Sequence, residues 1–224
     1  MHSAVPLVDA IAEEARRMGA TASSDGLRAQ AAFVRALADE LGHYHPSERR
    51  VAALHDQLGE ELSRLVELVP SLGPQDSAGE TVQPVDVLVV DDDDGALRAT
   101  AAAVRELGLA ARTARSGEEA LREFQRKPAA VVLSDWSMPG MTGLDLCAIL
   151  KGLDPQTYLI LMTGHDDPGL REGARHGVDD FLRKPIDLDE LAVRLRAGAK
   201  LVQAMRTVAL VTRHLKAHDD KLEA

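Results

Sequence analysis

From residue 85 onward, short apolar runs alternate with longer stretches of helical periodicity. Runs that are apolar throughout are buried on both faces, which is typical of strands in a parallel sheet covered by helices. Five such units in succession predict an α/β domain with a five-stranded, doubly wound parallel sheet. The expected strands are Val85–Val90, Ala110–Ala114, Ala129–Ser134, Tyr158–Met162 and Asp179–Leu182.

The stretches between the strands predict helices, and a further long helix follows Pro185. The expected helices are Ala96–Leu107, Gly117–Gln125, Gly143–Leu150, Asp167–His176 and Asp187–Leu222. At about 1.5 Å per residue, the last helix would be roughly 50 Å long. A sheet of five strands covers only its first half, so its second half needs another partner.

The sequence before residue 71 has helical periodicity and no strand pattern, which predicts an all-helical region for dimerisation or signalling. The helical stretches are Val5–Met18, Leu27–Leu41 and a third between Pro46 and Pro70. Residues 71–84 are rich in proline, glycine, serine and charge, as linkers are. We therefore expect four parts: helical region 1–70, linker 71–84, α/β domain 85–200 and helical extension 201–224, a candidate coiled coil.

Charge and composition exclude some classes of protein. The formal net charge is -10 and no Lys/Arg cluster offsets it, so we expect no direct nucleic-acid partner. Cys147 is the single cysteine, which excludes an intrachain disulfide and fits a reducing compartment. No apolar run approaches the roughly 18–20 residues of a membrane span, and the acidic start of the chain argues against a signal peptide. We expect a soluble, cytoplasmic protein with no membrane partner.

Polar side chains follow four of the predicted strands. Asp91 and Asp92 follow the first strand, Asp135 the third, Thr163 the fourth and Lys184 the fifth. The carboxyl ends of parallel strands meet at one edge, and three carboxylates there cannot all be ionised without a cation. Oxygen ligands of this kind suit Mg²⁺. The lysine and the threonine would stabilise charge on a transferring phosphoryl group, with Asp135 as the nucleophile.

Four segments carry a resemblance to a known family: Val87–Asp93, Leu133–Gly143, Leu161–Gly164 and Phe181–Pro185. Together they resemble the receiver domains of two-component response regulators, whose fold is flavodoxin-like. The resemblance covers about half of the chain. Each motif is weak alone, but the four in this order at strand ends are highly specific.

The resemblance implies a metal site and a phosphoryl acceptor. Asp135 would be phosphorylated, Asp92 would bind Mg²⁺ directly and Asp91 would act through water. Asp135 would share the metal, and Ser137 would offer it a backbone carbonyl. The phosphoryl donor would be a phosphohistidine of a histidine kinase or phosphotransfer protein, and the output a downstream protein target. Whether such a chain also removes its own phosphoryl group, and so counts as an enzyme, is left open.

The resemblance also assigns a switch. Thr163 and Lys184 would contact the phosphoryl oxygens, and Phe181 matches the aromatic switch position. The family usually has a cis peptide before Pro185. Asp94 has no catalytic counterpart, and we expect it to be the N-cap of the following helix.

One N-terminal segment has a second resemblance. Residues 48–62 are similar to the phosphoacceptor box of one histidine-kinase subfamily, Ala-Arg-Glu-Leu-His-Asp-x-Leu-Gly. This makes His55 a candidate second phosphoacceptor in a relay. The segment is one residue short between Val51 and His55, and no second bundle helix or ATP-binding domain accompanies it. A plain helical dimerisation or partner-binding module is the alternative.

An enzymatic alternative also exists. Val89–Leu97 resembles the first motif of haloacid-dehalogenase-type phosphatases, Asp-x-Asp-Gly-Thr-Leu, with Ala96 in place of the threonine. That interpretation leaves Asp135 unexplained. A phosphatase of this type would carry phosphate on an aspartate of the first strand, whereas a receiver carries it on Asp135.

Leucine and valine recur every seven residues along the second half of the last helix, as in a coiled-coil seam. The seam consists of Leu201, Val208, Leu215 and Leu222, with Ala204 and Val211 between them. We expect it to hold a homodimer. In the alternative, the same stripe packs on the N-terminal helices of its own chain and closes a four-helix bundle. Both arrangements bury the stripe, so hydrophobicity alone does not decide between them.

Overall fold

The computed structural model contains one parallel sheet of five strands in the order β2-β1-β3-β4-β5. It describes residues 85–164 and 176–222, with side chains of the last helix up to residue 206, and in the N-terminal region residues 13, 15–17, 28, 30–32, 34–36, 38, 57–61 and 64. The strands are β1 Asp86–Val90, β2 Ala110–Ala114, β3 Val131–Asp135, β4 Tyr158–Thr163 and β5 Asp180–Arg183. The predicted doubly wound sheet is confirmed, with each strand within two residues of its expected bounds.

Burial follows position in the sheet. The central strands β1, β3 and β4 are buried along their whole length, as their continuous apolar sequences predict. β2 was expected to be buried as well, but most of its residues are partly or fully exposed. β2 lies at one edge of the sheet with a single neighbour, β1, but β5 at the other edge is mostly buried, so edge position permits this exposure without requiring it. The strand tolerates Arg112 and Thr113 for the same reason.

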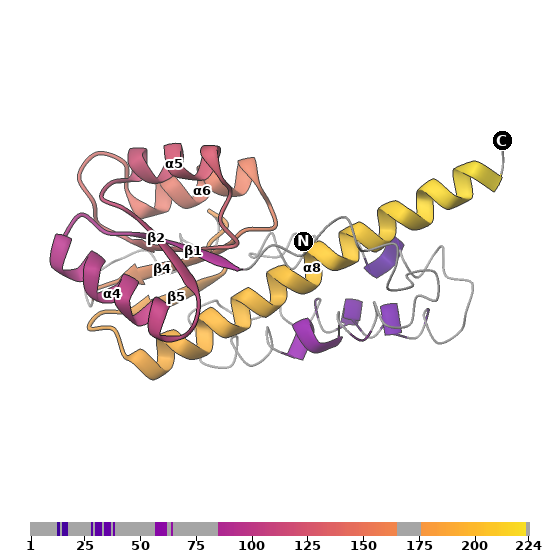
Figure 1. Cartoon of the computed structure of the whole chain (residues 1–224), viewed down its shortest axis with the longest axis horizontal. Coiled ribbons are helices and arrows are strands. Elements are labelled where there is room, and N and C mark those ends of the chain that lie inside the picture. The colour runs from indigo at the N-terminus through magenta and orange to yellow at the C-terminus, as the bar shows by residue number, and fades with distance from the viewer. Residues whose placement is uncertain are drawn as a thin grey trace.

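Helices cover both faces of the sheet (Figure 1). α4 Asp94–Glu106 and the first part of α8 Leu188–Leu222 pack on one face. α5 Gly117–Arg126 and α6 Gly143–Leu153 pack on the other. Each face has its own cluster of buried apolar residues. The helix predicted over Asp167–His176 falls almost wholly outside the described residues.

The cap of α4 differs from the expected one. Asp93, and not Asp94, is the N-cap, with an extended backbone at φ -81° and ψ 113°. Its carboxylate accepts a hydrogen bond from the Ala96 amide at 2.7 Å. Asp94 is already the first residue of the helix, where a carboxylate is favourable because it faces the positive end of the helix dipole.

α8 is one continuous helix of 35 residues, as predicted. Its first part lies on the sheet, and its remainder runs beyond it (Figure 1). None of the helices in the described part of the chain has the length and apolarity to cross a membrane.

The described N-terminal residues are helical, in agreement with the sequence. They contact α8 just beyond the sheet. Leu58 shares a buried cluster with Leu201, and Lys200 Nζ lies 3.0 Å from Glu60 Oε1. The same cluster contains Ala15, Ala31, Val34 and Ala38 from the N-terminal region and Val202, Ala204 and Met205 from α8.

Two positions of the predicted coiled-coil seam are therefore covered within a single chain. Leu201 is 0% exposed and Ala204 is 4% exposed. At these positions the structure shows the alternative in which the stripe packs on the N-terminal helices. The seam side chains from Val208 onward, and the linker 71–84, lie outside the described residues.

Close packing joins α8 to the sheet at Gly198. A Cβ atom at this position would lie 2.5 Å from Cδ1 of Tyr158, the first residue of β4. The Tyr158 side chain is fully buried, so its ring has no free space into which to move. Glycine is required here by the close approach of the helix to the sheet.

We expect Gly198→Ala to lower the free energy of unfolding by about 1–3 kcal/mol, because the methyl group overpacks a buried ring. Urea denaturation followed by circular dichroism measures the change. The matched control is Gly152→Ala in α6, where an added Cβ meets nothing within 4 Å. That change should stabilise the protein by up to about 1 kcal/mol through the helix preference of alanine. Equal effects of the two substitutions would contradict the packing argument.

Candidate functional site

Three carboxylates meet at the carboxyl edge of the sheet. β1 pairs with β3 so that Val90 lies opposite Ser134, which sets Asp91 beside Asp135. One ligand oxygen from each of Asp91, Asp92 and Asp135 lies within 4.8 Å of the other two. Asp135 is the last residue of β3, whereas the sequence predicted that the strand ends at Ser134 and that Asp135 follows it. The predicted carboxylate cluster is present.

Lys184 supplies a positive charge to this cluster. Its Nζ lies 3.0 Å from Asp91 Oδ2 and 2.5 Å from Asp135 Oδ1. The backbone holds it there, because the Lys184 amide donates to the Thr163 carbonyl at 2.8 Å. The Lys184–Pro185 peptide is cis, as the resemblance implies.

The charged groups at the site change each other's pKa values. Burial raises the pKa of Asp135 above its ordinary value, and nearby Asp91 adds to the rise. The hydrogen bond and charge of Lys184 oppose it, as does a hydrogen bond from the Ser137 backbone. Burial lowers the pKa of Lys184, but its bonds to Asp135 and Asp91 outweigh burial and leave the pKa above its ordinary value. The opposite charges of Lys184 and Asp135 thus offset part of the cost of removing each of them from water.

The remaining predicted residues lie on β4 and β5. Thr163 ends β4, is 2% exposed, and donates its hydroxyl to the Gly164 carbonyl at 3.0 Å. Phe181, in β5, is buried in the cluster on the α5 and α6 face of the sheet. β4 and β5 pair so that Leu161 lies opposite Phe181. Thr163 therefore sits at the carboxyl edge, and Phe181 lies two residues before the end of its strand.

Two features of the loop after Asp135 were not recognised in the sequence. A Cβ on Gly143 would lie 2.0 Å from the Asp135 carbonyl oxygen, so this position accepts only glycine. The Glu118 carboxylate of α5 accepts a hydrogen bond from the Met141 amide at 3.2 Å. This bond links α5 to the loop between β3 and α6. Gly143 was noted only as part of a motif. Glu118 gives no signal in sequence, because the contact spans 23 residues.

His55, the candidate second phosphoacceptor, lies outside the described residues. The phosphatase alternative had no use for Asp135. In the structure, Asp135 belongs to the same carboxylate cluster as the two aspartates that follow the first strand.

Comparison with known proteins identifies the class. Residues 87–196 match the family described as the response regulator receiver domain. This part of the chain belongs to the response regulator receiver family, and the resemblance seen in the sequence is confirmed.

Individual relatives are also similar. The response regulator protein TodT of Pseudomonas putida is 32% identical over 137 residues, which are 61% of this chain and 60% of that protein. The probable transcriptional regulatory protein TcrX of Mycobacterium tuberculosis is 36% identical over 116 residues, covering 51% of this chain and 50% of that protein. The crystal structure of NtrX from Brucella abortus in complex with ADP is 25% identical with a TM-score of 0.53, covering 57% of this chain and 30% of that one.

These matches span 60% of the length of TodT and 50% of the length of TcrX. One of those relatives is described as a transcriptional regulator. The predicted absence of a nucleic-acid partner or a DNA-binding output therefore has no support from the comparisons.

We expect Lys184→Gln to bind Mg²⁺ on the order of tenfold more tightly, because one positive charge beside the carboxylates is removed. Fluorescence of Trp136, the single tryptophan and the neighbour of Asp135, can report the titration. The matched control is Lys127→Gln, which removes a lysine that pairs with Asp86 at the opposite end of β1. Unchanged or weaker affinity in Lys184→Gln would show that the lysine does not compete for these carboxylates.

Proposed function

We propose that this chain is a two-component response regulator that accepts a phosphoryl group on Asp135 from a phosphohistidine. The donor is a histidine kinase or a phosphotransfer protein. The observation that carries the proposal is the site itself: Asp135 lies in a cluster of three carboxylates with Lys184 Nζ at 2.5 Å, in a receiver-family domain.

The residues fit a divalent cation. Three carboxylate oxygens within 4.8 Å of each other form an oxygen-only donor set of the kind that Mg²⁺ prefers. Asp92 and Asp135 would hold the ion directly and Asp91 through water, with the Ser137 carbonyl as a further ligand. When bound, Mg²⁺ supplies positive charge that neutralises the oxygens of the incoming phosphoryl group.

The side chains of Asp135 and Lys184 carry out the other parts of the phosphoryl transfer. An Asp135 carboxylate oxygen forms the new bond to phosphorus while the donor's phosphorus–nitrogen bond breaks and the imidazole nitrogen keeps the electron pair. Lys184 stays charged because its pKa is raised, so its ammonium can neutralise a phosphoryl oxygen. Asp135 ends β3 and Lys184 follows β5, and although β4 lies between these strands their side chains meet at the carboxyl edge of the sheet, which favours a defined geometry of transfer.

An apolar groove beside the site offers a place for the donor. It has a volume of about 300 Å³ and lies between α4 and the start of α8. Lys184 lines it together with Ala96, Ala99, Ala103, Ile186 and Leu188. Leu188 is 61% exposed, so a partner that packs here would cover it next to the acceptor.

The output of the switch is proposed to pass through Thr163 and Phe181. A phosphoryl group on Asp135 would recruit the Thr163 hydroxyl away from the Gly164 carbonyl, which it contacts at 3.0 Å. The buried ring of Phe181 would respond to this movement, and phosphate would shift the balance between two arrangements. A downstream protein would bind one of them. The cytoplasmic location remains a prediction from the sequence.

Asp135→Asn should reduce Mg²⁺-dependent labelling by radioactive acetyl phosphate to below about 1% of wild type, because the nucleophile is gone. The control is Asp189→Asn, which changes an exposed aspartate in the first turn of α8. Labelling of Asp135→Asn at the wild-type level would refute the proposal. Label in the peptide that carries Asp91 and Asp92 would instead support the phosphatase alternative.

We also propose a homodimer through the part of α8 beyond the described side chains. α8 continues to Leu222, and among its described side chains Lys200 and Leu201–Met205 pack with the N-terminal residues. In the proposed dimer, the remaining seam packs against the same stretch of a second copy, and burial of each large side chain contributes about 1.5–3 kcal/mol.

Light scattering at micromolar concentration should give about 48 kDa, twice the 24.1 kDa of one chain. Truncation after Arg206 keeps the contacts of Leu201–Met205 and should yield the mass of one shortened chain. A mass of one chain for the full-length protein, with and without beryllofluoride, would exclude the dimer and leave packing within one chain as the explanation.

A further inference from the structure

A buried polar cluster joins β5 to α8. Asp180, the first residue of β5, accepts a hydrogen bond on Oδ1 from the Phe181 amide at 2.8 Å. The same oxygen pairs with the guanidinium group of Arg194 in α8. Its other oxygen accepts a hydrogen bond from the Tyr158 hydroxyl at 3.4 Å. The carboxylate of Asp180 thus touches the switch residue, a neighbouring strand and the long helix at once.

The cluster resists separation. Asp180 and Tyr158 are 0% exposed and Arg194 is 4% exposed. Arg194 is also held by Glu190 Oε1 at 2.6 Å, one turn earlier in α8. Moving β5 without α8 would leave a charge buried without its partner, which is strongly unfavourable. A displacement of the strand at Asp180 is therefore transmitted to the helix.

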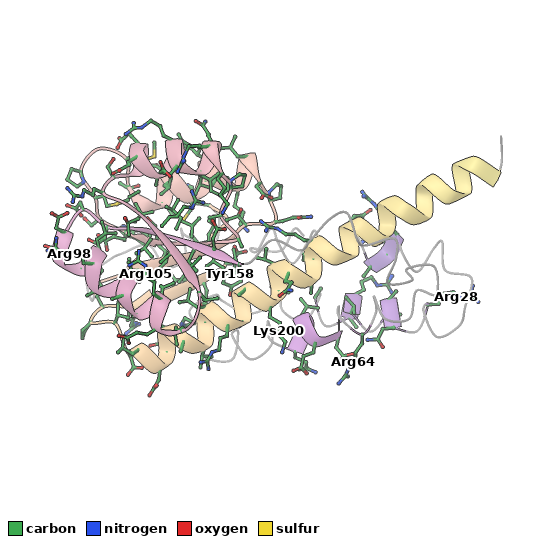
Figure 2. The ribbon with its side chains drawn as sticks, in the orientation of Figure 1. Arg28, Arg64, Arg98, Arg105, Tyr158 and Lys200 are labelled. Carbon is green, nitrogen blue, oxygen red and sulfur yellow. The ribbon has the colours of Figure 1, made fainter. Side chains whose placement is uncertain are left out.

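The same stretch of α8 then reaches the N-terminal residues. One turn after Arg194, Gly198 lies against the Tyr158 ring, and the next contacts are with the N-terminal segment. An ideal Cβ on Gly59 would lie 3.2 Å from Lys200 Cγ, and Leu58 shares a buried cluster with Leu201. Figure 2 shows Tyr158 on the receiver side of α8 and Lys200 farther along the same helix. Arg194 and Leu201 are seven residues apart, about 10 Å along a continuous helix.

We propose that the Asp180–Arg194–Tyr158 cluster couples the switch strand to the N-terminal helical segment through α8, so that this segment is the output element of the receiver. The inference rests on the proposed function, because it takes phosphorylation of Asp135 as the event that moves β5. The coupling does not need a new contact with the phosphoryl group. It uses the amide of Phe181, the buried ion pair and two turns of rigid helix.

Hydrogen exchange of the full-length chain tests the coupling. Beryllofluoride with Mg²⁺ serves as the phosphoryl mimic, Trp136 fluorescence reports occupancy of the site, and the amides of residues 57–61 report the output. In the wild-type protein, beryllofluoride should change exchange at residues 57–61 by about threefold or more, corresponding to a shift in local opening.

The decisive variant is Asp180→Asn with Arg194→Gln. It replaces the ion pair by a neutral pair of similar shape and should keep the Trp136 response while losing the change at residues 57–61. The matched control is Asp86→Asn with Arg112→Gln, a second ion pair of low exposure that joins β1 to β2. The control should keep both responses.

The outcomes separate the two proposals. A Trp136 response without any change at residues 57–61 in the wild type overturns the coupling but leaves phosphoryl reception intact. Retention of that change in the double variant overturns it as well. If the wild type gives no Trp136 response and takes no label from acetyl phosphate, the proposed function fails and the coupling fails with it.

A milder variant tests the coupling in case the double variant does not fold. If near-ultraviolet circular dichroism shows that Asp180→Asn with Arg194→Gln is unfolded, Tyr158→Phe removes a single hydroxyl from the cluster. This substitution should reduce the beryllofluoride-dependent change at residues 57–61 to about half of the wild-type value, since one of the cluster's hydrogen bonds is lost. An undiminished change in Tyr158→Phe overturns the coupling.

Discussion

Repulsion between carboxylates is the constraint on which the receiver site depends. Parallel register sets Asp91 and Asp135 at the ends of neighbouring strands. One carboxylate oxygen from each of Asp91, Asp92 and Asp135 lies within 4.8 Å of the other two. Like charges this close repel each other unless positive charge is placed beside them. Lys184 brings that charge from β5, 93 residues farther along the chain than Asp91. The strand order and the position of β5 therefore matter to the site chiefly because they place one ammonium group beside two carboxylates.

The long helix α8 packs on both the sheet and the N-terminal residues. Leu191 and Leu195 pack in the same buried cluster as the sheet, and Leu201 and Met205 pack there with the N-terminal residues. The proposed linker separates the two parts in sequence, but their apolar side chains form one connected cluster. A receiver whose last helix is shared in this way has a mechanical connection to its helical neighbour. This shared packing is the connection that the proposed coupling uses.

Much of the fold and the site was predictable from local pattern. Continuous apolar runs predicted the buried central strands, and the polar residues after the strands predicted Asp91, Asp92, Asp135 and Lys184 as neighbours, with Thr163 at the same edge. The errors have local physical causes. Asp93 and Asp94 are chemically equivalent candidates for the cap, and only the backbone angles select Asp93. β2 resembled the other strands in length, but its sequence includes Arg112 and Thr113, and in the structure most of its residues are partly or fully exposed at one edge of the sheet.

By itself, the sequence determined that the central strands are buried, where strands and helices alternate, and which side chains stand at the carboxyl edge of the sheet. Only the tertiary structure decided their partners: Lys184 with Asp91 and Asp135, Arg194 with Asp180, and Leu201 with Leu58. The physical reason is that burial of apolar surface is non-directional. The periodicity of apolar residues therefore shows which face of a helix or strand is buried, but not which element packs against it. Ion pairs and hydrogen bonds have strict distances and directions, and these exist only once the chain has folded.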